Sequence, residues 1–319
     1  MFLAPDGDEV AIANAAADFL AEAMPIARLH ERDPADMSGA LRRQLGEMGW
    51  FGLAVPECDG GSGLSAVEHA LFFREVGRQC GPVDGLAQTL ASMMPLDDAL
   101  RCSLLGGEVG VALALEDPAG LRVIGPRDAC YLISVTQDGA RLMAGAIGEW
   151  RPSLDPSASM RIVAETAVVE RASGPHIWQM GALGTAAMLV GIAEAALDLI
   201  VDYAKVRETF GRKIGSYQAV RHPCADMALR AEAARCQLWY AAAALKEGRH
   251  DAAVHLDAAK HLANQAAIAN ADTNIQLHGG IGVTEEHGAH LLLKHALLLG
   301  KLFGSKRTLL ARLLHAEAA

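Results

Sequence analysis

The stretch that most restricts the fold is residues 181–208, which read "GALGTAAMLVGIAEAALDLIVDYAKVRE". Apolar residues occur on nearly every face of a helix drawn through it, so other helices have to surround it. Residues 217–248, 251–277 and 289–316 are also helical in pattern and joined by short links. We therefore expect an antiparallel bundle of four long helices over residues 173–319. Pro223 predicts a kink in the second helix, or a late start near His222.

The rest of the chain divides into two parts. Residues 1–108 show helical patterns around a loop at 50–65 that is rich in Gly and Pro, and they predict an N-terminal helical domain. Residues 109–172 contain short segments rich in β-branched residues with turns between them, which predict a small antiparallel β domain. The expected fold is mainly α with a reduced middle β domain, which leaves little room for a site of its own.

Charge and composition exclude several classes of function. The net charge of −10 argues against general nucleic-acid binding, so an anionic ligand needs a local positive patch. No run of about 18 uninterrupted apolar residues predicts a membrane span, and the N-terminus shows no secretory signal. The six cysteines are widely separated, as expected for free thiols in a reducing cytoplasm. Four histidines near the C-terminus lack a metal-binding spacing, and we expect them to be surface or turn residues and no metal to bind: His278, His287, His290 and His295.

Residues 203–221, "YAKVRETFGRKIGSYQAVR", hold five cations and a single carboxylate, Glu208. Gly211 predicts a helix C-cap, which places Arg207 in the last helical turn. One interpretation is ordinary, because basic residues favour helix C-termini and Phe210 would then be a core residue. The other is an anion site in which the ring of Phe210 faces a planar base. Physical reasoning alone leaves both open.

The second motif, "QLHGGIG" at residues 276–282, interrupts a long helical pattern with three glycines. These glycines either make a tight turn or let backbone amides approach a phosphate or a sugar. The strand-then-helix context of a dinucleotide fingerprint is missing. The glycines alone therefore do not decide between a turn and a ligand site.

Three stretches together resemble the acyl-CoA dehydrogenase family over most of the chain. They are "LRRQLGEMGWFGLAVPECDGGSGLSAVEHALFFREVGR" (41–78), "RETFGRKIGSYQAVRHPCADM" (207–227) and "QLHGGIGVTEEH" (276–287). The resemblance implies the family's fold, with an N-terminal helical domain, a middle β domain and a C-terminal four-helix bundle. It also implies FAD as cofactor, an acyl-CoA substrate that loses two hydrogens from its α and β carbons, and an electron-transfer flavoprotein or similar acceptor.

In this family each flavin is shared between subunits. One subunit's β domain holds the isoalloxazine ring, and the neighbour's bundle holds the pyrophosphate and adenine ends. The resemblance places Arg207 on the pyrophosphate, and it places four more residues near the adenosine half: Thr209, Phe210, Ile214 and Gln218. It assigns backbone and amide contacts to the glycine motif: Gln276, Leu277, Gly279 and Gly280.

The catalytic base of the family is missing from the expected positions. Its Tyr-Glu-Gly-Thr stretch falls on "LFGS" (302–305), where Phe303 replaces the Glu, and the base position used by other members falls on Gly181. Neither residue can accept a proton, so we expect no catalytic residue in this chain. The β region also lacks the family's Thr-Glu-Pro…Gly-Ser-Asp stretch, and "ALEDPAGL" (114–121) is the nearest remnant.

These departures resemble the shorter, base-less subunit of heteromeric bacterial acyl-CoA dehydrogenases that act on steroid side chains or other bulky thioesters. The expected partner is a longer subunit that carries the catalytic Glu, and the expected assembly is a cytoplasmic heterotetramer. The alternatives are an active homo-oligomer with a relocated base at Glu285 or Glu286, a flavin monooxygenase on this fold, and a scaffold without flavin. The sequence does not identify the acyl-CoA substrate.

Overall fold

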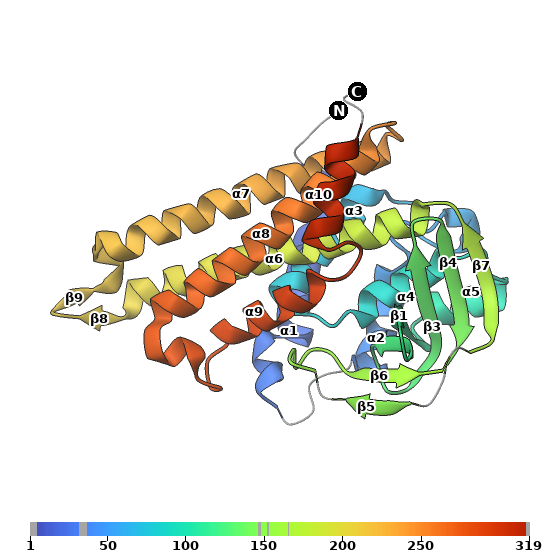
Figure 1. Cartoon of the computed structure of the whole chain (residues 1–319), viewed down its shortest axis with the longest axis horizontal. Coiled ribbons are helices and arrows are strands. Elements are labelled where there is room, and N and C mark those ends of the chain that lie inside the picture. Colours follow the sequence, from blue (N-terminus) through green and yellow to red (C-terminus); the bar gives the residue numbers. More distant parts are fainter. Residues whose placement is uncertain (1–4, 32–36, 146–147, 152, 165, 317–319) are drawn as a thin grey trace.

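Helix α6 (His176–Val206) runs through the centre of the molecule in the computed structural model, which describes residues 5–31, 37–145, 148–151, 153–164 and 166–316 (Figure 1). Most of its side chains from Met180 to Ala196 are buried, and it packs against helices from both ends of the chain. The prediction of a helix enclosed by other helices holds for residues 180–196, whereas Asp198, Asp202, Lys205 and Val206 near its end are exposed.

Three further helices complete the bundle around α6, and a last helix crosses its end. They are α7 (Gln218–Lys246), α8 (Ala252–His278), α9 (Ala289–Leu299) and α10 (Lys306–His315). The prediction of a fourth long helix over 289–316 is wrong, because the chain breaks between α9 and α10. Phe303 (φ 52°) and Gly304 (φ 119°) are left-handed there and cannot continue a right-handed helix.

Helix α7 begins at Gln218 and contains Pro223. The late start near His222 is therefore wrong. Pro223 lies in the second turn, where its missing N–H removes one backbone hydrogen bond from a helix of 29 residues. Packing of α7 against α6 and α8 outweighs that loss.

The N-terminal part is helical, as predicted, and it is joined closely to the bundle. Its elements are α1 (Gly7–Ala23), η1 (Ile26–His30), α2 (Gly39–Glu47), η2 (Trp50–Gly52), η3 (Glu57–Asp59), α3 (Ala66–Arg78), α4 (Asp84–Ser92) and α5 (Asp98–Leu105). Helix α3 lies against α6 at two glycines: a Cβ on Gly77 would sit 2.0 Å from the Met188 carbonyl oxygen, and one on Gly191 would sit 2.0 Å from that of Arg74. Only glycine permits this approach of the two backbones.

The middle region forms a seven-stranded sheet in the order β5-β6-β2-β1-β3-β4-β7. The strands are β1 (Gly110–Asp117), β2 (Gly120–Ile124), β3 (Ala129–Thr136), β4 (Gly139–Ala144), β5 (Glu149–Arg151), β6 (Met160–Val163) and β7 (Val168–Ser173). The expectation of a purely antiparallel module is wrong, because β1 and β3 are parallel. The β1–β2 hairpin occupies one side of β1, so the chain crosses over β1 and β3 pairs with its other side.

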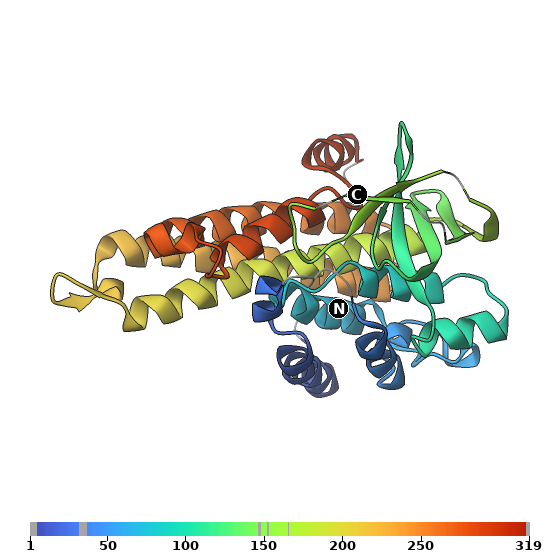
Figure 2. The same cartoon turned by 90° about the horizontal axis from the view of Figure 1, so that it is seen from below.

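The sheet lies at one end of the bundle, where β7 leads directly into α6 (Figures 1 and 2). A buried polar contact ties the β5–β6 connection to α9. Asp155 Oδ2 lies 2.7 Å from His295 Nδ1, and Ser157 Oγ lies 3.0 Å from the same nitrogen. Burial by itself would raise the pKa of Asp155, but the charge and hydrogen bond of His295 hold it below its ordinary value. His295 is fully buried, so its prediction as a surface or turn residue is wrong.

Two stretches of the described chain, Gly7–His30 and His176–Val206, are long and apolar enough to cross a membrane by length and composition. The second is α6, whose most apolar window is 72% buried within the fold. The core helices of many globular proteins have the same composition. These helices are therefore weak grounds for a membrane location.

Candidate functional site

The residues predicted to bind the cofactor gather at one end of the bundle, at the left of Figure 1. Helix α6 ends there at Val206, α7 begins there at Gln218, and α8 ends there at His278. A two-stranded hairpin, β8 (Glu208–Thr209) and β9 (Arg212–Lys213), projects from this end. The antiparallel order of the helices brings the two motifs together although about 70 residues separate them. We call this region the open end.

The tip of the hairpin is Phe210 and Gly211, both of which are left-handed, with φ of 48° and 76°. Gly211 therefore serves a tight hairpin turn, and its prediction as a helix C-cap is wrong. The helix ends at Val206, and Arg207 is the extended C-cap residue. Phe210 is 93% exposed, so the interpretation of this ring as an ordinary core residue is also wrong.

Four of the five cations in this segment already have partners within the chain. Lys205 Nζ bonds Asp202 at 2.9 Å, and Lys213 Nζ bonds Glu208 at 2.7 Å. The hydrogen bond from Lys213 also lowers the pKa of Glu208. The other two partners are a ring and a carbonyl: Arg212 lies 3.9 Å from the Tyr217 ring centroid, and Arg221 Nε donates to the Gly215 oxygen.

Arg207 is the exception. Among the residues that the structure describes, its exposed guanidinium has no ion pair and no side-chain hydrogen bond. Its backbone is well held, because its N–H donates to Tyr203 and its carbonyl accepts from Ile214, both at 2.9 Å. A fixed backbone with an unpaired cation fits an anion such as a pyrophosphate.

The other predicted residues of this segment differ in how far they can reach a ligand. Gln218 is exposed at the first position of α7. Thr209 is half-buried, and its carbonyl accepts from the Tyr217 hydroxyl at 3.0 Å. Ile214 is only 9% exposed, which indicates that its side chain braces the hairpin from inside.

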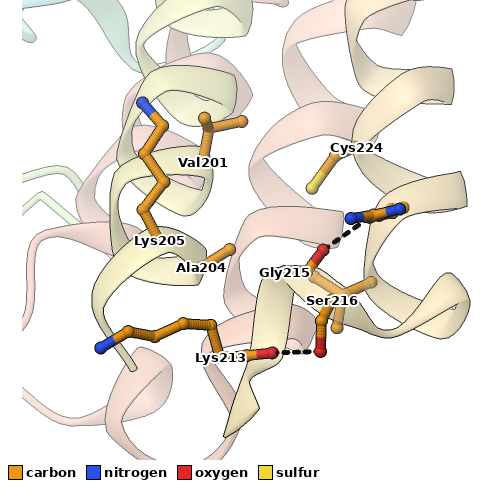
Figure 3. Close-up of a pocket in the computed structure, with 9 residues that line it drawn as sticks. Val201, Ala204, Lys205, Lys213, Gly215, Ser216 and Cys224 are labelled. Carbon is orange, nitrogen blue, oxygen red and sulfur yellow. Dashed lines mark hydrogen bonds between the residues drawn. The ribbon is translucent and has the colours of Figure 1, made fainter. Parts of the chain in front are cut away.

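A groove of about 420 Å³ lies between α6 and α7 beside the hairpin (Figure 3). Val201 and Ala204 contribute apolar lining, and Cys224 projects into the groove from α7. Lys205 and Lys213 extend along one side of it, and each is paired as described above. The groove therefore adds apolar surface to the open end and no further unpaired charge.

The glycine motif forms the second half of the open end. Gly279 (φ 68°) ends α8, and residues Gly279–Val283 form the short helix η5. A Cβ added to Gly279 or Gly280 would meet no atom within 4 Å, so open space lies against this backbone. Gln276 is exposed and Leu277 half-buried on the last turn of α8. This open backbone, at the same end of the bundle as Arg207, fits the pyrophosphate and sugar portion of a dinucleotide such as FAD.

His278 is the buried member of this motif, at 5% exposure, so its prediction as a surface or turn residue is wrong. Its ring lies between those of Tyr203 and His287, with centroid distances of 4.5 and 4.4 Å. Sequence reasoning missed this stack. No local pattern links Tyr203 to two histidines that lie 75 and 84 residues further along the chain. No group of three or more His, Cys, Asp or Glu side chains in the described part of the chain could hold a metal ion.

The two positions expected for the catalytic base meet at the other end of α6, which we call the closed end. A Cβ added to Gly181 would lie 2.3 Å from Cε1 of Phe303, so the ring occupies the space that a side chain at 181 would need. Phe303 is 6% exposed and packs edge-on against Trp178, with ring centroids 5.4 Å apart. The structure thus brings together the two positions that the sequence identified separately, and neither offers a group that can accept a proton.

The remnant of the flavin-wrapping stretch forms a tight turn between β1 and β2. Asp117 Oδ1 accepts from the Ala119 N–H at 3.0 Å, and Oδ2 pairs with Arg122 at 2.5 Å. The backbone hydrogen bond and the arginine hold the pKa of Asp117 below its ordinary value. Both oxygens of the Asp117 carboxylate are therefore used within the hairpin.

Glu285 and Glu286 are exposed and precede His287, which lies beside Tyr203 at the open end. Tyr203 is 22 residues beyond Gly181 on the same helix, or about 33 Å away. A catalytic base at Glu285 or Glu286 would therefore lie at the open end, whereas Gly181 and Phe303 lie at the closed end.

Comparisons with known proteins agree with this architecture. Residues 6–99 match the family model for the acyl-CoA dehydrogenase N-terminal domain, and residues 177–316 match the model for the acyl-CoA dehydrogenase C-terminal domain. The acyl-CoA dehydrogenase IpdE2 of Mycobacterium tuberculosis is 32% identical over 279 residues, which cover 84% of this chain and 83% of IpdE2.

The acyl-CoA dehydrogenase FadE34 of the same organism is 34% identical over 303 residues, which cover 88% of this chain but only 42% of FadE34. The chain thus spans less than half the length of that relative. Among solved structures, a chain of the ChsE4-ChsE5 complex from Mycobacterium tuberculosis superposes with a TM-score of 0.79 and covers 100% of both chains. At 20% identity this likeness shows the fold alone.

Proposed function

The chain belongs to the acyl-CoA dehydrogenase family of FAD-dependent oxidoreductases, and we propose that it is a subunit that completes a flavin site on a longer partner. The partner supplies the sheet-side half of that site and the catalytic Glu. The cytoplasmic complex oxidises an acyl-CoA thioester to its 2,3-enoyl-CoA and passes electrons to an electron-transfer flavoprotein or a similar acceptor. Bound FAD would supply the two-electron acceptor chemistry at the α and β carbons.

The unpaired guanidinium of Arg207 carries this proposal. In a chain with a net charge of −10, four neighbouring cations are paired and this one is exposed at the end of the bundle where the open backbone of Gly279 and Gly280 also lies. Arg207 would hold the pyrophosphate, and the glycine backbone would let it approach. The exposed ring of Phe210 would offer a face to the adenine.

The length of α6 supports a site shared between chains. The sheet precedes the helix and the hairpin follows it, and a helix of 31 residues is about 46 Å long. The open end of one chain therefore has to serve a sheet on another chain. In the tight β1–β2 turn, both oxygens of the Asp117 carboxylate are bonded within the hairpin. This supports a partner whose β domain differs from this one.

The same turn counts against a flavin monooxygenase, which needs a complete flavin site. The distance of about 33 Å along α6 counts against Glu285 or Glu286 as a relocated base for a substrate bound near Gly181. The unpaired Arg207 counts against a scaffold that binds no flavin. The fold shared with a chain of the ChsE4-ChsE5 complex supports a heteromer as the assembly to test first.

The test is FAD affinity of the complex between this chain and its longer partner. An Arg–phosphate contact contributes about 1.5–3 kcal/mol, so Arg207→Ala should raise the Kd for FAD roughly 10- to 100-fold. Arg43→Ala removes an exposed arginine from α2 and should leave the Kd unchanged. Equal FAD affinity in the wild type and Arg207→Ala would show that Arg207 is only a charge at a helix end.

A further inference from the structure

Three aromatic rings pack together next to the glycine turn in the chain, and they join three segments. Tyr203 lies near the end of α6, His278 ends α8, and His287 lies in the connection from η5 to α9. The His278 ring is tilted by 32° against Tyr203 and by 49° against His287, with centroids 4.5 and 4.4 Å away. Tyr203 and His287 are 6.5 Å apart, so His278 is the middle ring. We call these residues the ring stack.

The ring stack links the two halves of the open end. The Tyr203 carbonyl accepts the Arg207 N–H at 2.9 Å, and His278 is followed directly by Gly279 and Gly280. A shift of His278 against Tyr203 would therefore move the glycine backbone relative to Arg207. Because a ligand that contacts both halves needs them at a fixed separation, the stack affects its affinity without touching it.

Hydrogen bonding fixes the proton of His278 on one nitrogen. Nδ1 lies 2.8 Å from the Asn274 carbonyl oxygen, which can only accept, so Nδ1 carries the hydrogen. Nε2 is buried and has no hydrogen-bond partner among the described residues. A second proton would place a buried N–H without an acceptor in contact with another imidazole. Burial lowers the pKa of His278 most; the hydrogen bond to Asn274 raises it, and His287 lowers it further.

The charged groups around the ring stack do not offset the cost of placing a second proton on His278. Burial first, and then His30 of η1, lower the pKa of His287. Burial, Lys294 and His30 lower the pKa of His290, while Glu285 raises it. The titratable groups that act on His278 and His287 are thus other imidazoles, and the carboxylate of Glu285 acts on His290.

We propose that the ring stack positions the Gly279–Val283 turn against Arg207, and that it does so only while His278 is neutral. His278 is the positioning residue. Acidification protonates the stack, separates the rings and releases the glycine turn. This inference rests on the proposed function for its effect on FAD, but the state of the turn can be measured without FAD.

The first experiment measures hydrogen–deuterium exchange of amides 279–283 in the full chain without FAD, at about pH 7.5 and about pH 5.5. His278→Phe keeps a ring in the stack but cannot titrate. Comparison at equal pH cancels the intrinsic change in exchange rate. At the lower pH the wild type should exchange at least about tenfold faster than His278→Phe. If the wild type and His278→Phe exchanged these amides at the same rate as each other at each pH, the proposal would be overturned.

The second experiment measures the Kd for FAD of the complex with the longer partner over the same pH range. The wild-type Kd should rise roughly tenfold on acidification, and that of His278→Phe should stay constant. His250→Phe, which replaces an exposed histidine at the opposite end of α7, should keep the wild-type profile. A constant wild-type Kd with a released turn would separate the stack from ligand binding and overturn its positioning role. An absence of FAD binding at every pH, with the exchange result as expected, would instead reject the proposed function.

If His278→Phe fails to fold, an NMR titration of the wild-type chain gives the same answer. The His278 ring and the amides of residues 279–283 should then titrate with one midpoint. Turn amides that stay unchanged while His278 ionises would contradict the proposal.

Discussion

The two ends of α6 differ in how far their side chains are buried and bonded within the chain. At the open end, Phe210 is 93% exposed, Arg207 has no partner among the described residues, and the backbone of Gly279 faces open space. At the closed end, Phe303 fills the space beside Gly181 and is 6% exposed. The open end thus shows polar and aromatic groups that have no partner in the described part of the chain. The closed end, where neither residue can accept a proton, shows ordinary core packing.

The contrast extends to backbone strain. Phe210 and Phe303 are both left-handed, which costs about 1–2 kcal/mol for a residue other than glycine. Burial of the Phe303 ring against Trp178 offsets that cost within the chain. Phe210 is 93% exposed, so burial of its ring does not offset that cost within the described chain.

The largest expected effect concerns catalysis at the closed end. The purified chain supplied with FAD should not reduce an artificial electron acceptor with any acyl-CoA, because neither Phe303 nor Gly181 can remove the α proton. Activity should appear with the longer partner and fall about 10²–10⁴-fold when the partner's catalytic Glu is replaced by Gln. Phe303→Glu in this chain should not restore turnover. Steady oxidation by a preparation that mass spectrometry shows to be free of partner would place a base in this chain.

The second effect concerns packing at the closed end. Phe303→Ala should lower the free energy of unfolding by about 3–5 kcal/mol through the cavity it leaves. Gly181→Ala should cost about 1–3 kcal/mol in the wild type, because its Cβ meets the ring. In the Phe303→Ala background the same change should stabilise the helix by about 0.5–1 kcal/mol. Urea unfolding of the four proteins tests this, and additive effects would mean that the two residues do not share this space.

The third effect is a pH dependence of stability from Lys260. Its Nζ donates to Asn264 Oδ1 and to the Leu299 carbonyl just before the closed end, at 2.9 and 3.2 Å, and burial lowers its pKa to about 7. Above pH 7 the folded chain has lost this proton while the unfolded chain keeps it up to about pH 10. The contribution of Lys260 to the free energy of unfolding should therefore rise by about 2 kcal/mol between about pH 7 and pH 9. Lys260→Met should remove that rise, whereas Lys205→Met, an exposed control, should retain it.

The smallest effect concerns strain at the open end. Phe210→Asn should leave the free energy of unfolding of the isolated chain unchanged or raise it by up to about 1 kcal/mol, because Asn tolerates the left-handed turn. The same variant should bind FAD and the partner less tightly, since the ring is lost. A clear loss of stability in the isolated chain would show that Phe210 already packs within its own fold.

The sequence predicted the central helix, the helical N-terminal part and the positions of both motifs. It did so because apolar periodicity and glycine placement are local properties. Gly211 was misassigned because a glycine after a helix suits both a C-cap and a hairpin turn, and only the pairing of Glu208 with Lys213 distinguishes them. The break at Phe303 was missed because a buried aromatic residue gives no local sign of left-handed geometry.

Long-range contacts explain the other differences. The parallel pairing of β1 with β3 depends on a crossover that alternating residues do not encode. The burial of His278 and His295 depends on Tyr203 and Asp155, which are 75 and 140 residues away in the chain. The state of Arg207 as the unpaired cation became visible only when the partners of its four neighbours were known.

The FAD content of the chain purified alone and of its complex with the longer partner tests the central claim most directly. Gel filtration coupled to absorbance at the flavin band gives FAD per chain for each species. The account predicts little or no FAD on the chain alone, and FAD in the complex that is lost selectively with Arg207→Ala. A yellow homo-oligomer with one FAD per chain would contradict it.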